Sequence, residues 1–71
     1  MMNKGLIIRK NGDEILFDEW TQKNNLETFV VQSEEGLLEI PIDPSTEYYD
    51  SDTGKTYFEA TGDEFKTVIL F

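Results

Sequence analysis

The chain has 71 residues, with neither cysteine nor histidine, and its 15 acidic residues against six basic ones give a net charge of −9. The length fits one small domain over residues 1–71. The missing residue types exclude disulfides, thiolate metal sites and catalysis by a Ser–His or Cys–His pair. We therefore expect a protein that is not an enzyme and that holds no cofactor and no metal at a built site.

The charge also restricts the partners. Attraction to phosphate dominates binding to DNA, RNA and anionic lipid, so a polyanion is disfavoured there and prefers basic proteins. No segment resembles a secretory signal, because the apolar run near the N-terminus covers only residues 6–8. The apolar run at 68–71 is too short to span a bilayer. Lack of cysteine is compatible with the cytosol, and we expect a cytoplasmic protein.

The first predicted element is a hairpin in the segment LIIRKNGDEILF. Asn11 and Gly12 suit a two-residue type I′ turn. That turn pairs Lys10 with Asp13, Arg9 with Glu14, Ile8 with Ile15, Ile7 with Leu16 and Leu6 with Phe17. The following residues 18–26 show no alternation, which predicts a loop or one short helical turn that carries Trp20.

The segment TFVVQSEEGLLEIPI predicts a second hairpin. Glu34 and Glu35 form its turn, and Gly36 takes the left-handed position. Pro41 lacks a backbone donor, so its strand is expected to end there or to lie at an edge. A further turn is predicted at 43–45.

A third hairpin is predicted in TEYYDSDTGKTYFEA, with a turn at Asp52–Thr53 and a left-handed Gly54. This register places Tyr49 opposite Tyr57. A fourth turn at 61–62 sets Phe58 opposite Phe65.

These elements predict an all-β domain of six or seven short antiparallel strands. In the last strand Phe65, Ile69 and Phe71 should point one way, and Val68 and Leu70 the other. A flat sheet cannot bury both sets. We therefore expect a meander folded into a small barrel or sandwich, in outline similar to SH3-like or OB-like folds, with the terminal strand central. A dimer or protein-binding patch is the alternative.

Two motifs in residues 48–58 fail on inspection. A phosphate loop needs a glycine where Tyr49 stands and a helix after Thr56. A calcium loop of the EF-hand type that begins at Asp50 needs Gly and Glu where Lys55 and Thr61 stand. The segment is therefore interpreted as a hairpin.

The predicted registers place three carboxylates in a row, with Glu47 opposite Glu59 and Glu59 opposite Glu64. Tyr49 and Tyr57 should lie on the same face beside Lys66. The candidate partner-binding residues are Glu47, Glu59, Glu64, Tyr49, Tyr57, Asp50 and Asp52. The plain alternative is a solvated surface on which lysines relieve the repulsion.

The function predicted from these features is a non-catalytic, acidic protein-interaction domain with a basic partner. In its narrower form the chain is an inhibitor that occupies the nucleic-acid groove of another protein, and its compact, acidic composition suits a phage-encoded or mobile-element factor. Carboxylates two residues apart on a strand lie about 6.6 Å apart and can mimic backbone phosphates. The alternatives are a structural subunit of a homo-oligomer and a weak calcium-binding domain.

Overall fold

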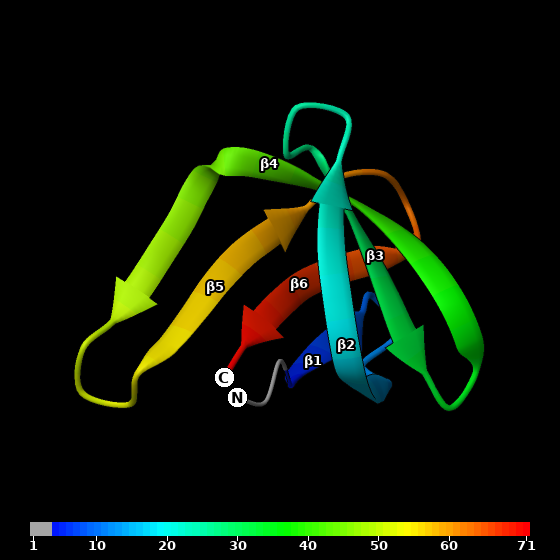
Figure 1. Cartoon of the computed structure of the whole chain (residues 1–71), viewed down its shortest axis with the longest axis horizontal. Coiled ribbons are helices and arrows are strands. Elements are labelled where there is room, and N and C mark those ends of the chain that lie inside the picture. The colour runs from blue at the N-terminus through cyan, green and yellow to red at the C-terminus, as the bar shows by residue number, and fades with distance from the viewer. Residues whose placement is uncertain (1–3) are drawn as a thin grey trace.

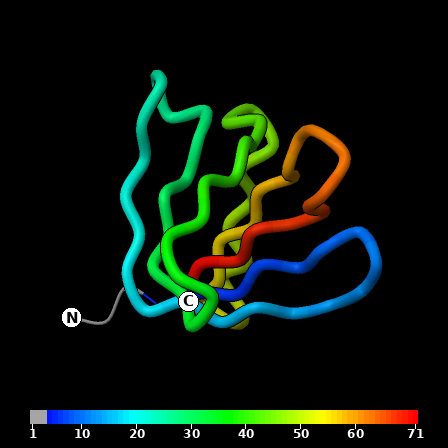
Figure 2. The backbone as a smooth tube through the Cα atoms, turned by 90° about the vertical axis from the view of Figure 1, so that its right-hand side faces the viewer, coloured from blue at the N-terminus to red at the C-terminus, as the bar shows by residue number. Residues whose placement is uncertain are grey.

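The strands pair in chain order and the last strand pairs with the first, which closes a barrel. The structure is a computed structural model that describes residues 4–71. Within these residues the strands are β1 (Gly5–Arg9), β2 (Glu14–Lys23), β3 (Thr28–Ser33), β4 (Gly36–Asp50), β5 (Lys55–Ala60) and β6 (Phe65–Leu70). All pairs are antiparallel (Figure 1). Figure 2 shows the first and last strands side by side, and β6 lies between β5 and β1 as expected.

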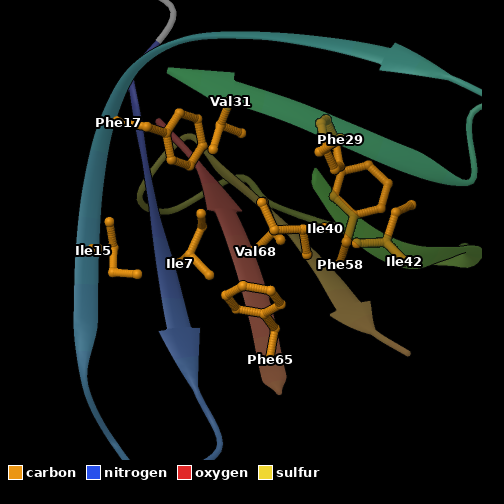
Figure 3. Packing of buried hydrophobic residues seen from close by; sticks show 10 residues of the cluster. All are labelled: Ile7, Ile15, Phe17, Phe29, Val31, Ile40, Ile42, Phe58, Phe65 and Val68. Atoms are coloured by element: carbon orange, nitrogen blue, oxygen red, sulfur yellow. The ribbon is translucent and has the colours of Figure 1, made fainter. Parts of the chain in front are cut away.

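Inward-facing side chains from all six strands of residues 4–71 fill the barrel (Figure 3). The buried cluster consists of Ile7, Ile15, Phe17, Phe29, Val31, Ile40, Ile42, Phe58, Phe65 and Val68. Phe29 packs edge-to-face against both Trp20 and Phe58, with ring centroids 5.1 Å apart in each pair. Such pairs add to the area that the rings bury.

The first hairpin differs from the prediction by one residue. Ile7 lies opposite Ile15 and Leu6 opposite Leu16, because the connection covers residues 10–13 and the Arg9 N–H donates to the Asp13 carbonyl at 2.8 Å. The predicted pairing of Leu6 with Phe17 is wrong. A change of one residue in the pairing register exchanges the two faces of a strand. Ile7 therefore enters the core and Leu6 points outward.

The predicted loop or helical turn at 18–26 is wrong for residues 18–23, since β2 continues through Lys23, and is confirmed as a turn only at 24–26. A bulge between Phe17 and Glu19 shifts the alternation. Phe17 and Trp20 therefore both face the interior, which hides the strand pattern in the sequence. The turn that follows holds three residues with positive φ, namely Asn24, Asn25 and Leu26.

In the second hairpin the predicted turn is confirmed, because Ser33 pairs with Gly36 and the φ of Gly36 is 96°. Pro41 does not end its strand. It lies where β4 changes partner: Pro41 pairs with Thr28 of β3, and Ile42 pairs with Ala60 of β5. Proline has no N–H to donate, but its carbonyl accepts from the Thr61 N–H at 2.9 Å, and the next residue, Ile42, donates to the Glu27 carbonyl at 2.9 Å.

The turn predicted at 43–45 is an irregularity inside β4. Asp43 Oδ1 accepts bonds from both the N–H and the hydroxyl of Ser45, at 3.0 and 2.7 Å. The Thr46 hydroxyl donates to the Asp43 carbonyl at 2.6 Å and accepts from the Glu59 N–H at 2.9 Å. Side chains thus replace part of the backbone ladder.

The last two hairpins keep their turns but change register. Gly54 is left-handed, with φ 75°, yet the turn covers 51–54, so Tyr48 rather than Tyr49 faces Tyr57. Phe58 faces Val68 instead of Phe65. The cause is that Thr61 still bonds to β4, through its N–H to the Pro41 carbonyl at 2.9 Å, so β6 begins only at Phe65.

The face assignment of the last strand is partly wrong as well. Phe65 and Val68 are both buried in the core, because the register shifts between Ile8 and Arg9 along β1. Val68 pairs with Ile7 of the core, so the next residue, Ile69, points outward.

Replacing Leu26 by glycine should stabilise the fold by about 0.5–1 kcal/mol. A left-handed conformation costs an L-residue roughly 1–2 kcal/mol, and glycine avoids this cost. The net gain is smaller because glycine loses more backbone entropy on folding. Leu26 is 56% exposed, so little packing is lost. Urea denaturation measures the difference. Leu37→Gly, at an exposed strand position, is the control and should destabilise; equal losses in both variants would contradict the strain argument.

Replacing Gly5 by alanine should destabilise the barrel by roughly 1–3 kcal/mol, the usual range for overpacking. A Cβ at residue 5 would clash with the Phe17 ring and lie 2.5 Å from the Ile69 carbonyl oxygen. Gly12→Ala is the matched control, because nothing lies within 4 Å of a Cβ there and only the backbone conformation is strained. A Gly5→Ala midpoint in urea equal to that of the wild type would show that the chain ends are not tightly packed.

Candidate protein-interaction surface

The predicted row of three carboxylates does not form. Glu59 faces Asp43 on one side and Thr67 on the other. Glu64 lies in the loop before β6, at the end of the barrel that Arg9 closes. The longer connections at 51–54 and 61–64 shift both registers away from the predicted ones.

The remaining predicted residues fall into separate places. Tyr57 and Glu59 share the outer face of β5, because two residues separate them. Asp50 pairs with Lys55, and the Asp52 N–H donates to the Asp50 carboxylate at 3.0 Å. Tyr49 faces Thr56, on the face opposite to Tyr57. The expected grouping of Tyr49 with Tyr57 is therefore wrong.

Arg9 explains where Glu64 belongs. The Arg9 guanidinium lies 3.0 Å from Glu35, 3.6 Å from Glu64 and 5.7 Å from the centroid of the Phe65 ring. The hydrogen bond to Glu35 raises the pKa of Arg9, with help from the charge of Glu64. Turns from three parts of the chain thus meet at one cation, which gives Glu64 a structural partner.

A different set of side chains meets on the outer face of the barrel. Directly paired, outward-facing residues run across β4, β5, β6, β1 and β2. We call them the outer stripe: Tyr48, Tyr57, Ile69, Leu6 and Leu16. The row is apolar throughout, apart from the tyrosine hydroxyls.

The outer stripe is covered in its centre and open at its ends. Ile69 is 9% exposed although it lies outside the core cluster, whereas Tyr48 and Leu16 are each 62% exposed. The Tyr48 and Tyr57 rings lie 6.2 Å apart between centroids. Cross-strand contacts of this kind stabilise a sheet, but the two open ends leave apolar surface in contact with water.

The row on one side of the outer stripe is acidic. Its paired residues are Asp43, Glu59, Thr67, Ile8 and Glu14. Among residues 4–71, ion pairs form at Arg9 and Lys23 only, so these three carboxylates have no cationic partner there. On the opposite side Asp50 pairs with Lys55, whose Nζ lies 5.1 Å from the centroid of the Phe71 ring. That row is mixed in charge.

Leu6, Leu16, Tyr48 and Ile69 were not among the predicted site residues. The sequence signal was the presence of apolar residues on both faces of the first and last strands. These residues form one stripe only when the registers of four neighbouring strand pairs are all correct, so the stripe could not be predicted from single strands.

The described surface also includes two open depressions. One is lined by Asn24, Glu27, Thr28, Pro41, Ile42, Asp43, Pro44 and Thr61, and the other by Glu19, Trp20, Thr21, Val30, Gln32 and Leu37. Residues 4–71 contain no group of three or more His, Cys, Asp or Glu that could hold a metal ion. Weak calcium binding at the acidic turns stays a prediction.

Within the same residues, no helix is long and apolar enough to cross a membrane. Comparison with protein-family models, with curated proteins and with solved structures finds no match to this chain.

The pKa of Asp43 lies below its ordinary value of 3.8, first because of the hydrogen bond from the Ser45 hydroxyl and then because of the Ser45 N–H. A lowered pKa in the folded state means that the stabilisation is complete above the ordinary value and is lost as the pH falls through the lowered one. Ser45→Ala should therefore raise the Asp43 pKa in a carboxyl NMR titration below pH 5, while Ser51→Ala should not. An unchanged titration in Ser45→Ala would refute this bonding.

Proposed function

We propose that the chain is a non-catalytic, acidic protein-interaction domain that binds a basic partner through the outer stripe. The observation that carries this proposal is an apolar row, exposed at both ends, on a barrel whose interior is already filled. The carboxylates that border this row have no cationic partner among residues 4–71.

The composition of the outer stripe supports contact with a protein. Tyrosine is enriched at interfaces because its ring is apolar and its hydroxyl is polar. Four gaps between neighbouring strands, each about 4.8 Å, give the stripe an arc of roughly 19 Å. An apolar centre with a polar rim is the usual arrangement of a protein–protein interface.

Charge selects the partner. The net charge of −9 and the acidic row attract cations over a distance and accelerate association. The narrower hypothesis, an inhibitor that occupies a nucleic-acid groove, also remains a proposal. Its supporting acids are now Asp43, Glu59 and Glu14, because the row of Glu47, Glu59 and Glu64 is not formed.

Self-assembly through the same stripe is the second candidate, because exposed Leu16 and Tyr48 could pack against another copy. Like charges oppose it, since each copy carries −9 and the acidic row would approach its own image. Sedimentation at micromolar concentration separates the two candidates, and our proposal expects a monomer.

The test of the proposal is a matched set of variants. The protein is used to capture a partner from its host, the captured protein is purified, and calorimetry measures its affinity. Leu16→Ser combined with Tyr48→Ser should weaken binding at least tenfold, because these are the exposed apolar side chains of the outer stripe, and truncation of a residue that carries binding energy costs more than about 1 kcal/mol.

Leu37→Ser is the control, since Leu37 is 70% exposed but lies outside the outer stripe. The affinity should also fall as salt is added, because charge attraction is screened. Equal affinities for all variants, or a partner without basic character, would refute the proposal.

A further inference from the structure

Within the described part of the chain, the second half of β4 has a partner strand on one side only. β4 spans 15 residues, of which 36–41 pair with β3. Residues 42, 43 and 48–50 pair with β5, with an irregularity between them. Figure 1 shows this half of β4 and β5 as an arm that leads away from β3. Among residues 4–71, no strand other than β5 pairs with 43–50. Although the barrel is closed, β4 therefore has an open edge along this arm.

The bonding of the arm shows which backbone groups face that edge. The Gly54 N–H donates to the Asp50 carbonyl at 2.7 Å, so the Asp50 carbonyl points toward β5. Along an antiparallel strand, the N–H and C=O of successive residues point to alternate sides. The N–H and C=O of Tyr49 therefore point to the open edge, where a further strand would bond.

Aromatic side chains flank the same edge on both faces. Tyr48 and Tyr49 are 62% and 61% exposed, and they lie on opposite faces because they are consecutive in a strand. A strand added beside β4 would place its alternate side chains next to one ring on each face. The edge thus offers backbone bonds and side-chain contacts together.

Charge decides what can occupy the edge. Residues 43–59 contain five acids and one base, a net of −4: Asp43, Glu47, Asp50, Asp52 and Glu59 against Lys55. Charges at an edge protect proteins from pairing with their own copies. A second copy of this acidic arm would be repelled, whereas an extended cationic segment would be attracted.

We propose that the open edge of β4 at residues 47–50 binds an extended, cationic segment of a partner protein by strand addition. The recognition mode is known in general: backbone bonds supply affinity, and alternate side chains supply specificity. The inference rests on the proposed function for the basic character of the partner, but its contacts are the outward backbone groups of the arm, which are not part of the outer stripe. Tyr48 is a member of the outer stripe and also flanks this edge.

The test uses a defined probe, an eight-residue peptide that alternates arginine with valine and has blocked ends. In NMR titrations of the full chain, the Tyr49 amide should shift and its hydrogen exchange should slow on binding. The same peptide with glutamate in place of arginine should not bind. Added salt should weaken the binding of the arginine peptide, because it screens charge attraction.

Two substitutions at one position separate the backbone from the side chain. Tyr49→Ala keeps the outward N–H and loses the ring, whereas Tyr49→Pro loses both but leaves the bonds to β5 in place. Proline should weaken peptide binding up to about tenfold more than alanine does, as expected for the one backbone hydrogen bond that the missing N–H would donate.

Equal binding by the two variants, or an unprotected Tyr49 amide in the wild-type complex, would overturn the inference. The protection measurement needs no substitution, so it decides the question even if Tyr49→Pro folds poorly. The two proposals can fail separately. If Leu16→Ser with Tyr48→Ser abolishes binding of the captured partner while Tyr49→Pro does not, the interaction domain stands and strand addition fails.

Discussion

The pairing of β1 with β6 is the constraint on which the rest of the structure depends. It joins Ile7 to Val68 and Leu6 to Ile69, residues from the two ends of the chain. Without this pairing the inward side chains would form one face of an open sheet, and a chain of 71 residues has little other apolar surface to cover them. Closure also creates the outer stripe, because its central contacts cross the same seam. Stability and the candidate surface thus have one origin, and such non-local pairing is slow to form.

Turn positions could be predicted from the sequence, whereas turn lengths could not. The left-handed glycines at 36 and 54 lie where expected. The residues that close each turn depend on bonds made elsewhere, as when Thr61 stays bonded to Pro41 and delays the start of β6. An error of one residue exchanges the two faces of a strand. The all-β barrel with a central last strand was therefore predictable, but the faces of the first and third hairpins were not.

The candidate site shows the same limit more sharply. Tyr57 and Glu59 were expected on a common outer face, and they share it because they belong to one strand. Every predicted contact between strands failed, since each needed a correct register at 51–54 or 61–64. In β2 even the pattern within one strand was not readable, because the bulge after Phe17 interrupts the alternation of apolar and polar residues. Properties of a single strand can be inferred from its own residues, whereas a surface that crosses five strands cannot.

The seam between the first and last strands has a further consequence. The Phe71 N–H donates to the Lys4 carbonyl at 3.0 Å, so these two residues are neighbours. Chains whose ends meet at the surface tolerate circular permutation, and exposed loop tips are the places where new ends are accepted. A permutant that links Phe71 to Lys4 and opens the chain at 51–54 would keep the ladder of the barrel while making β4 and β5 its terminal strands. In the present chain β4 and β5 form an internal hairpin, whereas in the permutant each would carry a free end to which another domain could be fused.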